Sequence, residues 1–155
     1  MCQSITVDSE DGSYEFIEPT PTDIRWFKNS EKLASTHSSG GKYAMTAVAV
    51  KGNRIFSSGY NYYPNRRGGE TKDELYHGLG AHAELMCLTS GDVNRCILYI
   101  AGVSPSGSLV SSRPCPRCWQ LIRNSRVKKI VYAQNGTVKA IKVRDMKHRQ
   151  IRALA

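Results

Sequence analysis

The sequence has no long apolar run and no secretory start. None of its apolar segments approaches the roughly 20 residues that a membrane-spanning helix needs. The N-terminus has neither the cationic start nor the apolar stretch of a signal peptide. We therefore expect a cytoplasmic protein without membrane contact. A length of 155 residues suits one domain, because two domains of that total length would each have a small core.

A disulfide framework is also missing. The chain has five cysteines, an odd number at irregular spacing, which are Cys2, Cys87, Cys96, Cys115 and Cys118. In a chain without an export signal, such a set indicates free thiols or metal ligands.

Positive charge is absent from the start of the chain, and negative charge is nearly absent from its end. The first 23 residues contain six acids and no Lys or Arg, whereas the residues from Arg113 onward contain twelve Lys or Arg and the single acid Asp145. The net charge is +9. This asymmetry indicates an anionic partner, anywhere from a nucleotide phosphate to RNA or DNA, without choosing between them. We interpret residues 1–20 as an acidic N-terminal arm, either poorly ordered or added to a sheet edge.

Hydrophobic patterns predict three helices and five strands in the body of the chain. The helices are expected to start near Pro21, at Ala81 and at Pro114, and the strands at residues 43–50, 55–60, 96–101, 129–133 and 137–143. Gly52-Asn53 and Asn135-Gly136 predict hairpin turns. Residues 61–80 are expected to form a long polar loop. The order of elements predicts an α/β protein with one mixed five-stranded sheet and helices on its faces.

Two details of the C-terminal part are less regular. The alternation slips phase around Ala140-Ile141, which predicts a bulge or an edge position for the last strand. Residues 146–154 are compatible with a further basic helix.

The residues with the clearest chemistry lie at two predicted helix starts. His82-Ala83-Glu84 begins one helix, and the stretch from Pro114 to Cys118 (Pro-Cys-Pro-Arg-Cys) begins another. One imidazole and two thiolates make a zinc site with a coordination position left for water, as in catalytic sites. Glu84 is then placed to exchange protons with that water. A bare C-x-x-C can also be a redox pair or half of a structural zinc site.

This H-x-E and P-C-x-x-C pattern resembles the zinc-dependent cytidine and deoxycytidylate deaminase superfamily. The resemblance covers the chain from about Thr22 to Val143, and Gly59-Tyr60-Asn61 looks like the end of the second strand in deoxycytidylate deaminases. It implies a three-layer α/β/α fold, with residues 21–155 as a zinc-dependent deaminase domain.

The same resemblance implies a substrate site. Asn61 matches an asparagine that contacts the sugar, although it could instead cap a loop. Ala83, Ser112, Arg113 and Pro114 would orient the base. The resemblance also implies a homo-oligomer whose neighbours help to close each active site.

The end of the chain departs from the common pattern. Members with a histidine ligand usually place a helix between the last two core strands, whereas here Gln134-Asn135-Gly136 predicts an antiparallel hairpin, as in free-nucleoside cytidine deaminases. This mixture affects the expected substrate, not the reaction.

Three functions follow from these features. The first is hydrolytic deamination of a cytosine nucleotide or nucleoside to the uracil product and ammonia, most simply of dCMP to dUMP. The second is deamination of cytosine or adenine in single-stranded DNA or RNA, which the basic tail favours. The third is a nucleic-acid-binding module with a structural zinc, against which the retained Glu84 and the missing fourth ligand argue.

Overall fold

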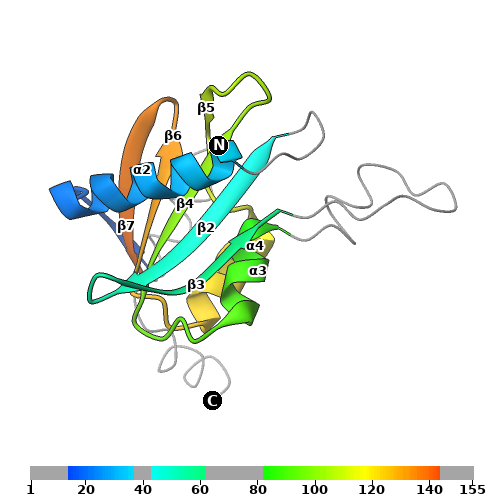
Figure 1. The fold of residues 1–155 in the computed structure, drawn as a ribbon. Helices are drawn as coiled ribbons and strands as arrows, with labels where there is room; N and C mark the ends of the chain where they lie inside the picture. The colour runs from blue at the N-terminus through cyan, green and yellow to red at the C-terminus, as the bar shows by residue number, and fades with distance from the viewer. Residues whose placement is uncertain (1–13, 37–42, 62–81, 144–155) are drawn as a thin grey trace, which may run out of the picture.

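A mixed β-sheet forms the centre of the computed structural model, which describes residues 14–36, 43–61 and 82–143 (Figure 1). Its strands are β1 (Tyr14–Ile17), β2 (Ala44–Lys51), β3 (Arg54–Tyr60), β4 (Ile97–Val103), β5 (Leu109–Val110), β6 (Lys129–Gln134) and β7 (Thr137–Val143). The order is β1-β7-β6-β4-β2-β3, with β5 paired to β4. Strands β4 and β6 run parallel, and the other pairs between described strands are antiparallel.

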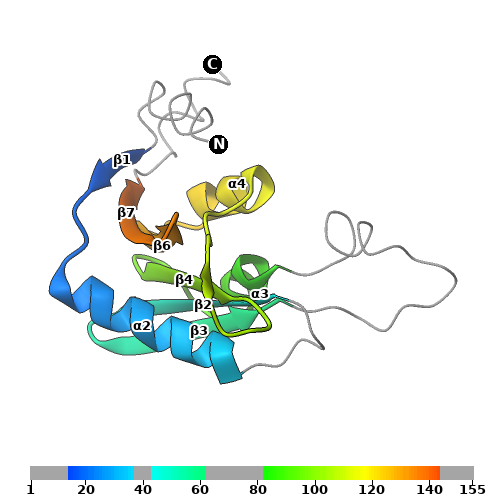
Figure 2. The ribbon, with the colours of Figure 1, turned by 90° about the horizontal axis from the view of Figure 1, so that it is seen from above.

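Helices cover both faces of this sheet (Figure 2). Helix α2 (Pro21–Thr36) packs on one face, and α3 (Ala83–Ser90) and α4 (Pro116–Asn124) pack on the other. The predicted three-layer α/β/α fold is confirmed, as is the antiparallel hairpin of β6 and β7. Both predicted hairpin turns have left-handed residues, with positive φ at Gly52, Asn53, Asn135 and Gly136.

The five predicted strands are present, but the sheet gains two short ones. Strand β5 has only two residues, too few for a detectable alternation. Strand β1 lies within the acidic arm and pairs with β7 from Tyr14 opposite Val143 to Ile17 opposite Ala140. Its backbone satisfies hydrogen-bonding groups of β7 that would otherwise lie at an open edge.

Strand β7 is therefore not an edge strand, and its pairing with β6 is regular from residue 129 to 134. The prediction of a bulge or an edge position was wrong. Ala140 and Ile141 are both buried because they face opposite sides of the sheet, and helices cover both sides. A register shift occurs instead in the β2–β3 pair, between Ala49 and Val50.

Strand β4 lies between two hydrophobic cores, one on each face of the sheet. Leu98 and Ile100 pack on the α3 and α4 side, whereas Tyr99 and Ala101 pack on the α2 side. All four side chains are fully buried. A central strand buried on both faces is continuously apolar, as its sequence shows.

The start of α2 is tied to the sheet by a buried carboxylate. Thr20 and Asp23 cap the helix reciprocally, since each backbone N–H donates to the other's side chain at 2.9 to 3.0 Å. The Asp23 carboxylate also accepts hydrogen bonds from the Tyr99 hydroxyl at 2.9 Å and from Lys129 Nζ at 2.6 Å. Burial alone would raise the pKa of Asp23, but these hydrogen bonds outweigh burial and lower it.

Two predicted features, the polar loop beyond Asn61 and the basic helix at 146–154, lie outside the described residues. Among the described helices, none has the length and apolar character to cross a membrane.

We expect Lys129→Met to reduce the free energy of unfolding by about 3 to 5 kcal/mol at neutral pH, because Asp23 would remain buried without its cation. The pKa of Asp23 is lowered in the folded protein, so the contribution of the pair is complete above the ordinary pKa of aspartate and is lost as the pH falls through the folded value. The difference in the free energy of unfolding between wild type and variant should therefore become smaller in acid. Urea denaturation at several pH values measures it.

Lys142→Met is the matched control, because Lys142 lies opposite Lys129 in the β6–β7 register and is exposed. It should change stability by no more than about 0.5 kcal/mol. Equal losses in both variants would contradict the assigned role of Lys129.

Candidate active site

Helix α3 begins unusually close to strand β3. A Cβ atom at Gly59 would lie 2.8 Å from the Ala83 carbonyl oxygen and 2.7 Å from Met86 Cβ, so only glycine fits there. Next to it, the Ser57 hydroxyl donates to the Cys87 carbonyl at 2.5 Å. These contacts place the first turn of α3 at the C-terminal end of β3.

His82 occupies the N-cap position of α3 but does not cap the helix. Its backbone is extended, and its side chain makes no capping hydrogen bond. The imidazole Nδ1 instead lies near the N-terminus of α4, 3.2 Å from Cys118 Sγ and 3.6 Å from Cys115 Sγ.

Helix α4 presents both thiols at its first turn. Cys115 is the N-cap residue, Pro116 is the first helical residue, and the Cys118 N–H donates to Cys115 Sγ at 3.4 Å. The fixed φ of proline and its missing N–H suit this first position. The positive end of the helix favours the ionised form of a thiol.

The three side chains form a group that fits a zinc ion. Their ligand atoms lie within 4.8 Å of one another. Tetrahedral zinc with Zn–N near 2.0 Å and Zn–S near 2.3 Å separates a nitrogen from a sulfur ligand by about 3.5 Å. The two nitrogen–sulfur distances of 3.2 and 3.6 Å agree with that geometry.

The two thiols of the metal group differ in acidity, and the acidity of Cys115 suits a bound cation. A hydrogen bond from the Cys118 thiol lowers the pKa of Cys115 to about 3, and His82 acts in the same direction. The same hydrogen bond, together with burial, raises the pKa of Cys118. The Cys115 thiol therefore ionises readily, which suits a metal ligand because a thiol binds a metal ion in its deprotonated form.

Glu84 is the buried carboxyl beside this group. It is 5% exposed and lies in the first turn of α3. Burial raises the pKa of Glu84 to about 7, and the negative charge of Cys115 adds to the shift, while its own backbone N–H and His82 oppose it. A carboxyl with a pKa near neutrality can both accept and release a proton.

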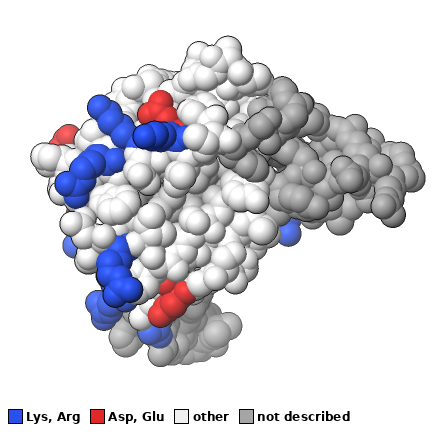
Figure 3. All heavy atoms as spheres, in the orientation of Figure 1, with Lys and Arg blue, Asp and Glu red and all other residues white. Residues whose placement is uncertain are grey.

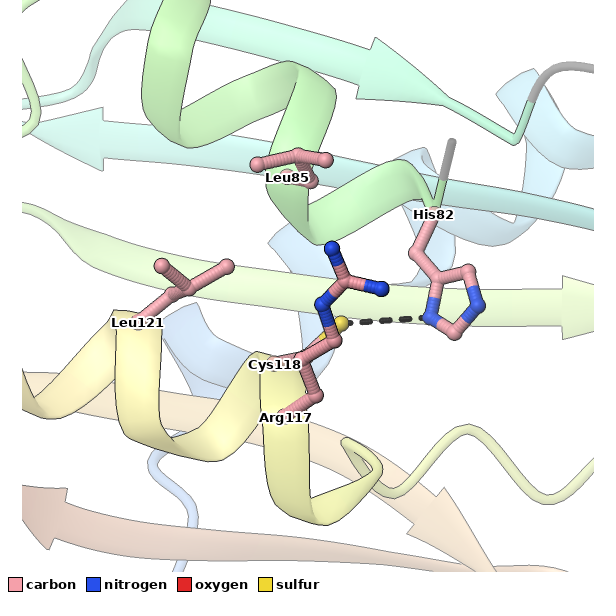
Figure 4. A pocket seen from close by; sticks show the side chains of 5 residues that line it. All are labelled: His82, Leu85, Arg117, Cys118 and Leu121. Atoms are coloured by element: carbon pink, nitrogen blue, oxygen red, sulfur yellow. Dashed lines mark hydrogen bonds between the residues drawn. The ribbon is translucent and has the colours of Figure 1, made fainter. Parts of the chain in front are cut away.

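A shallow pocket opens beside the metal group between α3 and α4. It is lined by His82, Leu85, Arg117, Cys118 and Leu121 (Figure 4). In the close-up, the Arg117 guanidinium lies between the two helices in front of Cys118. Leu85 and Leu121 were not among the predicted site residues, although each follows a ligand by three positions on its helix and so shares its face.

The predicted substrate residues lie in different environments. Asn61 is 7% exposed, and its amide accepts from the Met45 N–H at 3.0 Å and donates to the Tyr43 carbonyl at 2.9 Å. These are the contacts of a capping amide at the start of β2. One N–H and one lone pair of that amide are not used by these two bonds.

Ser112 ties strands together. Its hydroxyl donates to the Ile100 carbonyl at 2.6 Å and accepts from the Ala133 N–H at 2.9 Å, and its own N–H donates to the Ala133 carbonyl at 2.8 Å. It thereby anchors the segment that leads to Cys115. Arg113 is half-buried, whereas Pro114 and Ala83 are buried.

The chain is similar to known deaminases. A family model described as the cytidine and deoxycytidylate deaminase zinc-binding region matches residues 20–134. Among solved structures, a cytidine deaminase from Burkholderia pseudomallei aligns with a TM-score of 0.52 and 15% identity, over 76% of this chain and 89% of that chain.

A dCMP deaminase from the cyanophage S-TIM5, in apo form, aligns with a TM-score of 0.48 and 23% identity, over 72% of this chain and 82% of that chain. No curated protein matches the chain. The matched region contains most of the sequence together with His82, Glu84 and both cysteines of α4, and the chain therefore belongs to the family of cytidine and deoxycytidylate deaminases with a zinc-binding region.

Proposed function

We propose that this protein is a zinc-dependent hydrolase that deaminates a free cytosine nucleotide, with dCMP converted to dUMP and ammonia. The observation that carries the proposal is the junction of two helix starts, where His82 and two thiols surround one point and the buried Glu84 lies beside them. His82, Cys115 and Cys118 would hold the zinc ion. When bound, zinc supplies the Lewis acidity that makes water a nucleophile at neutral pH.

Glu84 is the residue that we assign to proton transfer. Its carboxylate takes a proton as water adds to C4 of the base, delivers it to the ring nitrogen, and supports proton delivery to the departing ammonia. Burial keeps bulk water away from this exchange.

The choice of a phosphorylated substrate rests on charge near the site. Arg117 lines the pocket beside His82, and Arg113 lies two residues before Cys115. Arginine is well suited to a phosphate because its guanidinium can make paired hydrogen bonds. The Gly59-Tyr60-Asn61 sequence and the histidine ligand favour a deoxycytidylate over a free nucleoside. We assign the contact with the sugar to the remaining hydrogen-bonding capacity of Asn61.

Glu84→Gln should reduce kcat by about two to four orders of magnitude, because the amide keeps the shape of the side chain but cannot shuttle a proton. Zinc content should stay at the wild-type level. Steady-state deamination of dCMP and metal analysis measure the two quantities. Glu18→Gln, an exposed glutamate before α2, is the control, and substantial turnover in the Glu84 variant would exclude the assigned role.

Cys115→Ala should abolish zinc binding and lower thermal stability, because only two ligands would remain. Mass-spectrometric metal analysis of the purified protein reports the zinc content per chain. The control is Cys96→Ala, which removes a buried thiol just before β4, outside the group. Zinc content equal to wild type in the Cys115 variant would refute the ligand assignment.

Arg113→Gln with Arg117→Gln should reduce kcat/KM for dCMP by about 10- to 100-fold, the usual contribution of hydrogen bonds to a charged group, with a smaller change for deoxycytidine. The ratio of the two kcat/KM values isolates recognition of the phosphate. A wild-type enzyme that prefers deoxycytidine, or that acts only on cytosine within single-stranded DNA or RNA, would contradict the proposed substrate.

A further inference from the structure

The end of the sheet opposite to the metal group carries a band of basic side chains. We call this band the basic end, and it consists of Lys51, Arg54, Arg95, Arg126, Lys128 and Lys142. The metal group lies near the C-terminal ends of β3 and β4, whereas Arg54 begins β3 and Arg95 precedes β4. In Figure 3, one group of Lys and Arg side chains lies at the lower left of the face shown, where Figure 1 places the β2–β3 turn, and a second group lies at the upper left.

Hydrogen bonds and strand register connect the members of the basic end. Lys51 lies opposite Arg54 in the β2–β3 hairpin, and its Nζ donates to the Asn94 carbonyl at 3.3 Å. The neighbouring Arg95 N–H donates to the Arg126 carbonyl at 3.0 Å.

The band continues to the last strand. The Val143 N–H donates to the Lys128 carbonyl at 2.9 Å, next to Lys142. The band crosses five adjacent strands, which at the usual strand spacing extends over about 19 Å. Beyond Val143, the sequence adds four Lys or Arg and one acid.

Few acids compensate this charge among the described residues around the basic end. Asp23 is buried and paired with Lys129, which is not a member of the band. Asp92 is exposed, and its carboxylate accepts from the Asn94 N–H at 3.0 Å. The exposed Glu15 also lies opposite Lys142 in the β1–β7 register. Six basic side chains with two exposed acids beside them still form a surface that attracts anions.

Two of the arginines occupy backbone positions that favour glycine. Arg95 has φ of 65° at the third position of the turn that the Cys96 N–H closes onto the Val93 carbonyl. Arg126 has φ of 65° directly after Ser125, the C-cap of α4. Glycine is the usual residue at both kinds of position, and a side chain there costs on the order of 1 kcal/mol. Both arginines are exposed, and a backbone hydrogen bond joins them.

An exposed aromatic ring lies at one side of the basic end. Phe56 is 37% exposed, with Lys51 Nζ 4.8 Å and Arg54 Cζ 5.6 Å from its ring centroid. Basic side chains with accessible aromatic rings are the combination that single-stranded nucleic acids bind, by phosphate contacts and base stacking.

We propose that the basic end binds the phosphate backbone of single-stranded nucleic acid, independently of its sequence. The width of the band matches several successive phosphates, which a mononucleotide does not have. Because it lies at the other end of the sheet from the metal group, bound polymer would leave that group accessible. The inference does not depend on the proposed deaminase activity.

The test is fluorescence anisotropy with a labelled oligothymidylate, which contains no cytosine and so is no deaminase substrate. Arg95→Gly with Arg126→Gly removes two charges and relieves both left-handed positions. The loss of two phosphate contacts should make the plot of log association constant against log salt concentration shallower, by about 1.4 in slope. It should weaken binding about 25-fold at about 0.1 M salt. The thermal midpoint should equal or exceed that of wild type.

Lys28→Gln with Lys32→Gln is the matched control, because it also removes two charges, from exposed positions on α2 that are not members of the band. Its slope should stay at the wild-type value. Equal weakening in both double variants would overturn the proposal in favour of diffuse attraction by net charge. Absence of binding by the wild-type protein would also overturn it.

Two further measurements keep the result decisive. If the glycine variant fails to fold, Arg95→Asn with Arg126→Asn makes the same test, because asparagine tolerates the left-handed conformation. If polyglutamate competes for the basic end as strongly as oligothymidylate does, the basic end binds polyanions in general. That result would overturn nucleic acid as its specific ligand. Turnover of dCMP should be unchanged in the glycine variant, so loss of oligonucleotide binding and loss of deaminase activity are separately visible.

Discussion

The close approach of α3 to β3 at Gly59 is the constraint on which the candidate active site depends. With no side chain at this position, the helix backbone rests directly on the strand, and His82 at its start reaches toward α4. A larger residue would displace the whole first turn, including Glu84. The sheet therefore sets the position of the imidazole through a backbone contact, not through any residue that touches the metal group itself.

A second anchor positions the thiols. Ser112 bridges β4 and β6 through its hydroxyl, at the place where these parallel strands meet the segment leading to α4. The chain then enters α4 with Cys115 at the N-cap and Pro116 in the first turn. Two helices that start side by side at one end of the sheet thus bring together residues 33 and 36 positions apart in the sequence. At the other end of the same sheet, α2 starts beside Lys129 and the β2–β3 turn, and the strand ends there carry the basic side chains.

Much of the fold was predictable because its signals are local. Turn residues at Gly52-Asn53 and Asn135-Gly136 have the backbone freedom that tight hairpins require, and the apolar runs of β4 and β6 are typical of strands buried on both faces. The outer strands were not predictable in this way. Strand β1 forms because β7 offers it a partner, and the two consecutive buried residues Ala140 and Ile141 reflect helices on both faces, not a bulge.

For this protein, the sequence by itself determined the reaction class, because His82, Glu84, Cys115 and Cys118 are recognisable by type and spacing alone. Their distances, the burial of Glu84 and the lowered pKa of the Cys115 thiol depend on how two helices meet, which only the tertiary structure decided. The same is true of Ser112 and Asn61, whose polar groups are engaged with backbone from distant strands. Local patterns specify residue chemistry, whereas pKa values and hydrogen-bond partners arise from groups that the folded chain brings together.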